Sequence, residues 1–324
     1  MKRLSFKWIL PVVAMPMLMA SCNSDEPRPE IQQYVTIDRV GVGELQTRYD
    51  ASDNFLPTSG IMKLMLNSSN ADSKYSTSGL DFTPTSNGWS TPNPLVWAVN
   101  SSADWSVFFT SRSANEYSYD ADSCVLAWSV PADQSKLSDE QFEGLDLLYD
   151  GGKSSSASLS PALKHAMSKI VINYYCEVDV ENDIVPDSVI ITNVHLSRNV
   201  EVEVGDGWQI LPYENTTAND IIQFRPVGTP TATKAKYEAI VIPRAKMKSY
   251  VKAIMKNYPY ITNGELRPRP RAIGNYEYND VIEPGKIYTF NFYFKGKYGS
   301  TGDVTISPWE EVNNAGSLVT DEEL

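Results

Sequence analysis

The stretch KIYTFNFYFKG, residues 286–296, alternates apolar and polar side chains with a period of two. This period is typical of a strand that buries one face and exposes the other. The inward set is Tyr288, Phe290, Phe292 and Phe294, and the outward set is Thr289, Asn291 and Lys295. Similar alternation recurs at residues 199–204 and 245–257, and shorter apolar strands are predicted at Ile61–Leu66, Leu95–Val99, Trp105–Thr110 and Cys124–Val130. The dominant pattern therefore predicts an all-β protein.

One helical pattern interrupts the strands. Ser160 and Pro161 suit a helix N-terminus, and the apolar residues that follow have spacings of three and four: Leu163, Ala166, Met167 and Ile170. The preceding stretch 150–158 has the Gly- and Ser-rich composition of a linker. We therefore expect two tandem β-sandwiches, residues 31–158 and 159–324, with one short helix near their boundary and a C-terminal tail.

The N-terminus has the features of an export signal. Lys2, Arg3 and Lys7 precede the apolar stretch 8–20, which is shorter than the roughly 20 residues of a membrane span and contains two prolines. The following LMASC, residues 18–22, resembles a lipobox, with a methionine at the usual leucine position. The sequence predicts a signal peptide over residues 1–21, a lipid on Cys22 and an acidic tether over residues 22–30, whose Asn-Ser-Asp-Glu start resembles a surface-targeting tag.

Charge and cysteine content narrow the function classes. The net charge is −12, and loss of the three positive charges of the signal peptide takes it to −15. Such an acidic chain lacks the electrostatic footprint of a nucleic-acid binder. After lipidation two cysteines remain, Cys124 and Cys176, each in a predicted strand, and we expect two free thiols in apolar surroundings.

Signals of catalysis and metal binding are weak. The chain has two histidines, His165 and His195, and no metalloprotease, nucleophile-elbow or phosphate-loop motif. We interpret His165 as a hydrogen-bonded structural residue. The acidic stretch 177–187 alternates with valines and lacks the glycine of a calcium loop, so we interpret it as a solvated strand face. We predict no enzyme, no metal and no cofactor other than the lipid on Cys22.

Several segments, in order along the chain, resemble elements of one family. They are LQTRYDASDNFLPTSGIMKLML (45–66), GWSTPNPLVWAVNSSADWSVFF (88–109), VPADQSKLSDEQFEGLDLLYD (130–150), SPALKHAMSKIVINYY (160–175), AIVIPR (239–244), EPGKIYTFNFYF (283–294) and VTISPWEEV (304–312). Together with the lipobox they resemble the fimbrillin family of Bacteroidales, the subunits of type V pili and their surface relatives. Arg244 departs from the glutamine that the family usually places there.

The resemblance implies two transthyretin-like sandwiches and an assembly mechanism. The lipid would carry the precursor to the outer surface, and an arginine-specific protease would cut after the first strand. The lost strand would be Ile31–Val40, with Val35 and Ile37 filling the groove. The cleavage site would be Arg48, with Arg39 as second choice inside the strand, and an uncut Arg48 is equally open. A donor strand from another subunit would then enter the groove by β-augmentation.

The donor strand itself is weakly marked. After Trp309 the tail offers only Leu318 and Val319 as an apolar pair. Either Val304 and Ile306 belong to the donor, or this subunit does not donate and is a tip or accessory subunit. The implied partners are other fimbrial subunits, and the implied location is the outer membrane, the cell surface and the fimbrium.

The alternative is a surface lipoprotein that does not polymerise and binds a host or bacterial glycan or protein. Exposure of Trp89, Trp97 and Trp105 in one patch would favour this alternative. A buried, extractable N-terminal strand would favour the fimbrial subunit.

Overall fold

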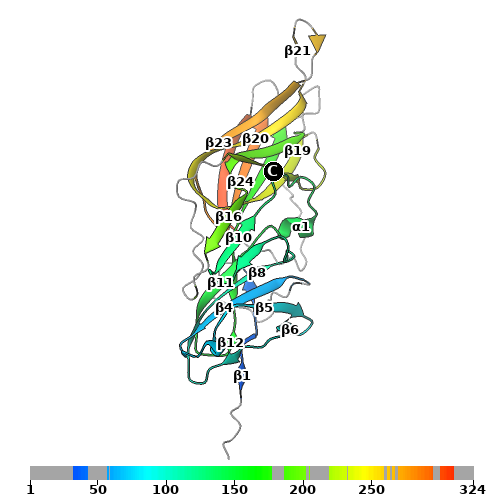
Figure 1. The fold of residues 1–324 in the computed structure, drawn as a ribbon. Helices are drawn as coiled ribbons and strands as arrows, with labels where there is room; N and C mark the ends of the chain where they lie inside the picture. The colour runs from blue at the N-terminus through cyan, green and yellow to red at the C-terminus, as the bar shows by residue number, and fades with distance from the viewer. Residues whose placement is uncertain are drawn as a thin grey trace, which may run out of the picture. The chain divides into compact units, whose positions relative to one another are not determined.

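The computed structural model describes residues 32–42, 57, 59–176, 186–201, 204, 219–231, 233–258, 261–262, 265–266, 269–294 and 300–309 (Figure 1). These residues are almost entirely β-structure, as the alternation predicts. The bounds of the elements follow sheet by sheet, starting with the sheet that contains the most strands.

The N-terminal half is built on a seven-stranded sheet. Its strand order is β3 (Gly41–Val42), β13 (Ala162–His165), β11 (Leu148–Ser154), β8 (Ala103–Thr110), β4 (Ile61–Ser68), β5 (Thr77–Thr85) and β6 (Gly88–Ser90). Smaller pairings border it: β1 (Gln33–Tyr34) with β7 (Val96–Trp97), and β2 (Thr36–Ile37) with β12 (Ser158–Leu159). A short 3-10 helix, Ser73–Tyr75, precedes β5.

Apolar side chains cover both faces of this sheet. Along β8, Trp105, Val107 and Phe109 enter one core cluster, whereas Phe108 enters another. This is the alternation that a two-sided strand requires. The seven-stranded sheet therefore separates two hydrophobic cores. The first core, which contains Phe108, continues into the C-terminal half; the second core contains the N-terminal segment.

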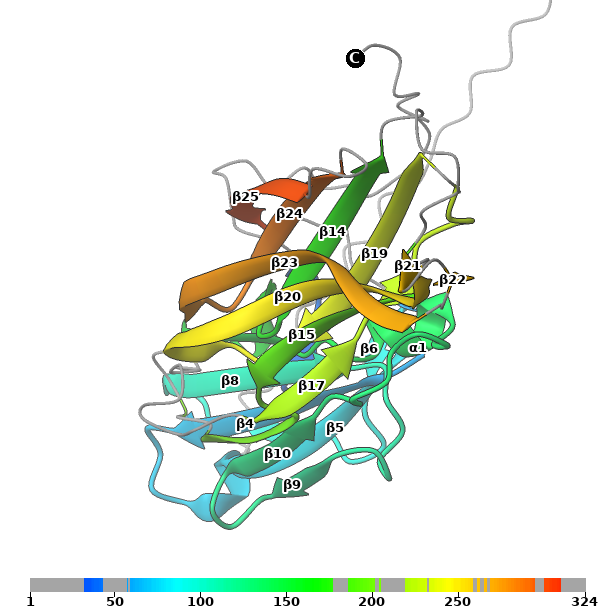
Figure 2. The ribbon, with the colours of Figure 1, turned by 90° about the horizontal axis from the view of Figure 1, so that it is seen from above.

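The C-terminal half packs two sheets face to face. A five-stranded sheet has the order β18 (Arg225–Pro226), β19 (Lys234–Val241), β14 (Ser168–Cys176), β24 (Lys286–Phe294) and β25 (Ser300–Pro308). A four-stranded sheet has the order β17 (Asp220–Gln223), β15 (Ser188–Val194), β20 (Arg244–Tyr258) and β23 (Arg269–Ile282). Figure 2 shows the strands of the second sheet crossing over those of the first. A small hairpin joins β21 (Ile261–Thr262) to β22 (Glu265–Leu266).

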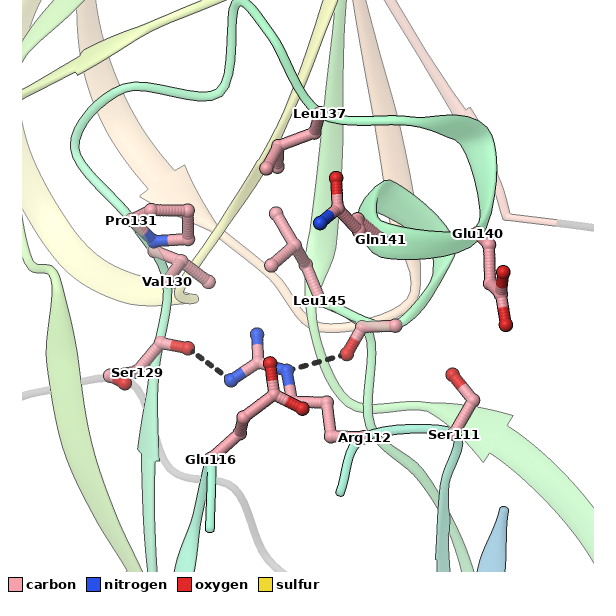
Figure 3. A pocket seen from close by; sticks show the side chains of 11 residues that line it. Ser111, Arg112, Glu116, Ser129, Val130, Pro131, Leu137, Glu140, Gln141 and Leu145 are labelled. Carbon is pink, nitrogen blue, oxygen red and sulfur yellow. Dashed lines mark hydrogen bonds between the residues drawn. The ribbon is translucent and has the colours of Figure 1, made fainter. Parts of the chain in front are cut away.

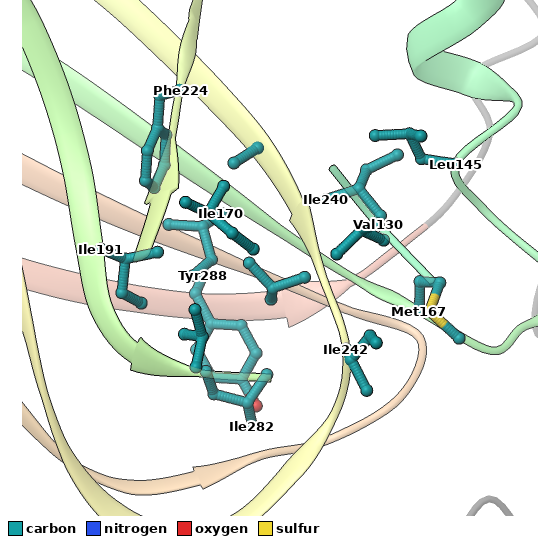
Figure 4. Packing of buried hydrophobic residues seen from close by; sticks show 14 of the residues in the cluster. Val130, Leu145, Met167, Ile170, Ile191, Phe224, Ile240, Ile242, Ile282 and Tyr288 are labelled. Atoms are coloured by element: carbon teal, nitrogen blue, oxygen red, sulfur yellow. The ribbon is translucent and has the colours of Figure 1, made fainter. Parts of the chain in front are cut away.

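The quoted stretch forms β24 over its described part, Lys286–Phe294, and its inward side chains enter the C-terminal core as predicted. Tyr288, Phe290 and Phe292 are buried, and β14 lies beside β24 in parallel with Ile170 opposite Tyr288. Figure 4 shows the side chains of Ile170, Ile191 and Tyr288 meeting between the sheets. Burial of each such side chain contributes about 1.5–3 kcal/mol. The two sheets of this half therefore form a sandwich, and their inward-facing side chains form its core.

The helix predicted at residues 160–170 is wrong. This stretch forms β13 and the start of β14, and the single α-helix of the described residues is α1 (Asp139–Glu143). The apolar residues at helical spacing are buried because two successive strands bury them: Leu163 lies in β13, Ile170 lies in β14, and Ala166 donates its backbone N–H to Leu147 between them. Ser138 and Gln141 form a capping box at α1, a local signal for the true helix.

Several contacts join the two halves. A three-stranded sheet pairs β10 (Val125–Ser129) with β9 (Ser118–Asp120) on one side and with β16 (Ser197–Glu201) on the other. The side-chain amide of Gln134 exchanges two hydrogen bonds, of 2.8 and 3.0 Å, with the backbone of Ile240 in β19. The first core runs across this joint. Strand β12 spans the predicted boundary at residue 158 and β13 lies beyond it, and both pair with the N-terminal segment. The division itself stays a prediction.

Candidate functional site

The N-terminal segment 33–42 is an extended chain held between two neighbours. On one side the N–H of Val35 donates to Leu95 O at 2.8 Å, beside β7. On the other side three N–H groups donate to the stretch 157–161: Thr36 to Ala157 O at 2.9 Å, Asp38 to Leu159 O at 3.0 Å and Gly41 to Pro161 O at 2.9 Å. The pairing is antiparallel to β7 and parallel to β12 and β13. The segment therefore occupies a groove with backbone acceptors on both walls.

The apolar side chains of the segment form part of the second core. Val35, Ile37 and Val40 expose 2%, 4% and 0% of their surfaces. They share a cluster with residues of the groove walls and of the seven-stranded sheet, among them Trp97, Phe109, Leu159 and Leu163. Without the segment, this apolar surface and the four backbone acceptors would face water. The groove is therefore stable only when an extended strand occupies it.

The outer side of the segment is polar. Ser158 on the groove wall donates to the carboxylate of Asp38, which also accepts a bond of 2.9 Å from Thr36 Oγ1. Arg39 is exposed and lies between β2 and β3, so the expectation that it sits inside a strand is wrong. Val40, the next residue, is buried in the second core. Cys22 and Arg48 lie outside the described residues, so the lipid and the preferred cleavage site stay predictions.

A half-buried carboxylate supports the groove wall. Asp150 Oδ2 accepts a hydrogen bond of 2.6 Å from the N–H of Ala162, whose strand β13 pairs with β3 of the segment. Burial raises the pKa of Asp150 above its ordinary value. The bond fixes the start of β13 next to the end of the N-terminal segment.

The C-terminal strand is engaged within its own chain. Strand β25 pairs with β24 over nine positions, which place Val304 opposite Phe290 and Ile306 opposite Tyr288. Val304 is partly buried against the first core, whereas Ile306 exposes 51% of its surface. Trp309 follows, and its indole stacks on His165 with 4.4 Å between ring centroids and 4° between planes. The end of the described chain is thus fastened beside the joint between the halves.

His165 is buried and hydrogen-bonded, as the sequence predicts. Its Nδ1 lies 2.5 Å from Asp146 Oδ2, and both residues are buried. His195 lies between β15 and β16, not in a strand, and burial lowers its pKa. Within the parts of the chain that the structure describes, no group of three or more His, Cys, Asp or Glu residues is placed to hold a metal ion.

The tryptophan patch that would favour glycan binding does not form. Trp89, Trp97 and Trp105 expose 9%, 5% and 8% of their surfaces and belong to the second core. Cys124 is a free cysteine with φ of 53° that precedes β10, so it is not part of the predicted strand face; the side chain of Cys176 lies outside the description. Among the described helices, none is long and apolar enough to cross a membrane.

Two features of the groove differ from what the sequence pattern predicts. Val40 is as buried as Val35 and Ile37, although it breaks their alternation. The wall strand β12–β13 was interpreted as linker and helix. The run of apolar residues at every second position, Leu159, Pro161 and Leu163, was the available signal for a strand.

Comparison with known proteins gives the family. A model of the fimbrillin-like family matches residues 50–309. The fold is similar to those of candidate cell adhesion proteins from Bacteroides uniformis ATCC 8492 (TM-score 0.54, 13% identity, 86% of this chain and 99% of the other) and Bacteroides ovatus ATCC 8483 (0.58, 13%, 86% and 98%). It is also similar to a fimbrial protein from Bacteroides vulgatus ATCC 8482 (0.52, 10%, 86% and 99%). No curated protein matches the chain in sequence. Because the family match covers residues 50–309, most of the chain, this protein belongs to the fimbrillin-like family.

Proposed function

We propose that this chain is a structural subunit of a cell-surface fimbrium, exported as a lipoprotein through Cys22 and assembled by strand exchange after cleavage at an arginine. The observation that carries the proposal is the docked N-terminal segment with Val35, Ile37 and Val40 buried. Family membership and the fimbrial and adhesion proteins of similar fold support the same class of function.

The physics of exchange follows from the groove. Removal of the segment leaves four backbone acceptors unpaired and a strip of apolar side chains exposed. Another extended strand with apolar residues at alternate positions restores both interactions, and its backbone bonds supply affinity while its side chains fix the register. The segment is therefore a placeholder that is exchanged for a strand of another subunit.

The geometry favours Arg48 over Arg39 as the cleavage site. A cut after Arg39 leaves Val40 and β3 in the groove, with the bond from Gly41 to Pro161 O intact. A cut after Arg48 frees the whole stretch 32–42 in one piece. In this proposal the lipid on Cys22 leaves with the segment, so the outer-membrane anchor is temporary.

The proposal is tested by incubating the intact precursor with an arginine-specific protease. We expect a new N-terminus at Tyr49 and ladders that resist SDS. The Arg48→Lys variant should give neither, whereas Arg39→Lys should behave like the wild type. If Arg48→Lys is still cleaved, the cleavage site is not Arg48. If the mature N-terminus is always Cys22, the chain is not cleaved at an arginine at all.

One observation favours a subunit that accepts a strand without donating one. Val304 and Ile306 are the best apolar residues for a donor, and they lie in β25, which is hydrogen-bonded to β24. Clean cleavage at Arg48 without ladders would support this second candidate, a tip subunit or a surface adhesin. Addition of a synthetic peptide with an alternating apolar sequence should then yield a stable one-to-one complex with the cleaved chain.

A further inference from the structure

A second concave site lies away from the groove. It is a cavity of about 580 Å³ formed by three stretches: residues 111–116 after β8, residues 129–131 at the end of β10, and residues 137–145 around α1 (Figure 3). Its volume lies in the range of small-molecule sites. Val130 and Leu145 of its lining belong to the first core, whereas the N-terminal segment belongs to the second. Pocket and groove are therefore separate sites.

Arg112 forms the base of this pocket and is held rigidly. Its Nε donates to Gly144 O at 2.6 Å and its Nη1 donates to Ser129 O at 2.7 Å, which ties the α1 segment to β10. The guanidinium lies 4.1 Å from the centre of the Trp128 ring. Burial lowers the pKa of Arg112 to about 10, so the group stays charged at neutral pH.

One nitrogen of Arg112 is left over. Nη2 is buried and has no hydrogen-bond acceptor among the described residues. A buried donor without an acceptor costs about 1–3 kcal/mol. In Figure 3 the guanidinium sits at the foot of the cavity, below Val130 and Leu145 and next to Glu116. The foot of the cavity therefore carries a fixed positive charge.

The remaining lining has two chemical characters. Val130, Pro131, Leu137 and Leu145 supply an apolar wall. Ser111, Glu116, Ser129, Glu140 and Gln141 supply polar groups around it. Glu116 is itself positioned, because its Oε2 accepts bonds of 2.9 and 2.8 Å from the N–H and hydroxyl of Ser113.

This combination selects a ligand that has an apolar C–H face and several hydroxyl groups. The carboxylates of the lining can accept hydrogen bonds from ligand hydroxyls, and the side chains of Ser111, Ser129 and Gln141 can donate to them. The two carboxylates Glu116 and Glu140 outnumber the single guanidinium, so the local charge is negative and disfavours an acidic ligand. We propose that the pocket binds a neutral saccharide of one or two sugar rings. The proposal goes beyond assembly and gives the subunit a binding activity of its own.

Saturation-transfer NMR on the intact purified chain tests the proposal. The probes are glucose, galactose, mannose, N-acetylglucosamine and lactose, with glucuronate as the acidic comparison. We expect transfer to the C–H protons of at least one neutral sugar and weaker transfer to glucuronate. In the Glu116→Ala/Glu140→Ala variant the transfer should fall at least fivefold. Glu143→Ala, on the same helix but outside the pocket lining, should keep it.

A second variant guards against an effect on folding. Leu137→Trp places a large side chain in the cavity and leaves every polar group in place, so it should abolish transfer while the melting temperature stays near that of the wild type. The proposal is overturned if no neutral sugar shows transfer, or if glucuronate binds better than the neutral sugars. It is also overturned if both pocket variants show the same transfer as the wild type. None of these outcomes bears on strand exchange, because the cleavage assay probes the other core.

Discussion

At the scale of single residues, a half-buried carboxylate, Asp150, supports the groove, and a buried carboxylate, Glu238, helps to join the two halves. Asp150 supports the groove wall through one backbone hydrogen bond, while burial raises its pKa above the ordinary value of 3.8. A raised folded-state pKa means that folding favours the protonated form. The stability from this group is complete below about pH 3.8 and is lost as the pH rises through its folded-state pKa.

Asp150→Asn should therefore stabilise the protein at neutral pH. The amide oxygen still accepts the bond from Ala162, and no charge is buried. We expect the melting temperature at pH 7 to rise by about 1–3 °C, and the difference from the wild type to shrink towards pH 4, as measured by circular dichroism. The exposed Asp122→Asn variant should show no such pH-dependent difference. A lower melting temperature at pH 7 would show that the bond to Ala162 needs the carboxylate.

Glu238 has the opposite behaviour. Burial by itself would raise its pKa, but hydrogen bonds and charges from Lys169 and Arg225 outweigh burial and lower the pKa below the ordinary 4.5. Its stabilising contribution is therefore present above about pH 4.5 and is lost as the pH falls through the lowered value. Arg225 also donates to Asp139 of α1 at 2.9 Å. By holding Arg225 in place, Glu238 therefore helps to join the two halves.

Glu238→Gln should cost about 3 kcal/mol of unfolding free energy at pH 7, because it leaves Arg225 and Lys169 without their buried counter-charge. Urea unfolding at pH 7 and pH 4 measures the effect, which should be smaller at pH 4. Asp139→Asn is the matched control on an exposed carboxylate and should cost less than about 1 kcal/mol. Equal losses in the two variants would contradict a special role for the buried pair.

At the scale of elements, the N-terminal segment is an extended chain that lies between β7 on one side and β12 and β13 on the other. Its contacts include four backbone bonds, the strand pairings with β7, β12 and β13, and three buried side chains of the second core. Local opening of such an element exposes the groove of the second core but leaves the first core intact. The segment can therefore leave its groove without unfolding the C-terminal sandwich.

Charges in the groove should release the segment selectively. In Val35→Asp/Ile37→Asp, two buried apolar side chains become carboxylates, which cannot stay charged in the core. Hydrogen exchange of the amides of Thr36, Asp38 and Gly41 should accelerate at least 100-fold, while amides of β14 and β24 stay protected. Gln33→Asp/Thr36→Asp, on the exposed side, is the control and should exchange like the wild type. If the amides of β14 and β24 also lost protection, the segment would be required for the stability of the whole chain.

At the scale of the whole molecule, the two halves share one hydrophobic core. Leu126 and Trp128 of β10 cluster with residues of the C-terminal sandwich, and β10 pairs with β16 over five positions. A core that crosses a joint couples the stability of the parts on either side. The described chain from β4 onwards should therefore unfold as one unit.

Calorimetry should show a single transition with equal calorimetric and van't Hoff enthalpies. Leu126→Ala, at the centre of the joint, should cost about 2–5 kcal/mol and lower the transition without splitting it. Ile282→Ala in the C-terminal core serves as a comparison and should shift the same single transition. Two separate transitions in the wild type would show that the joint does not couple the halves.

The sequence by itself determined the strand content and the inward residues of the long strands. Period-two alternation at residues 286–296 predicts β24 and its buried face correctly, because a half-buried strand imposes that period whatever its neighbours. The order of segments also pointed to the fimbrillin-like family. Local pattern failed at residues 160–170, where burial by two successive strands produces the same spacing as one helix face.

Only the tertiary structure decided which strands meet. The walls of the N-terminal groove come from β7 and from β12–β13, more than fifty residues apart in the chain, and no local pattern records that pairing. The pocket under α1 likewise depends on Arg112 reaching the carbonyl groups of Ser129 and Gly144. Backbone acceptors carry no sequence signal, because every residue has one. The groove and the pocket therefore both depend on contacts between distant segments, which form only when the chain folds.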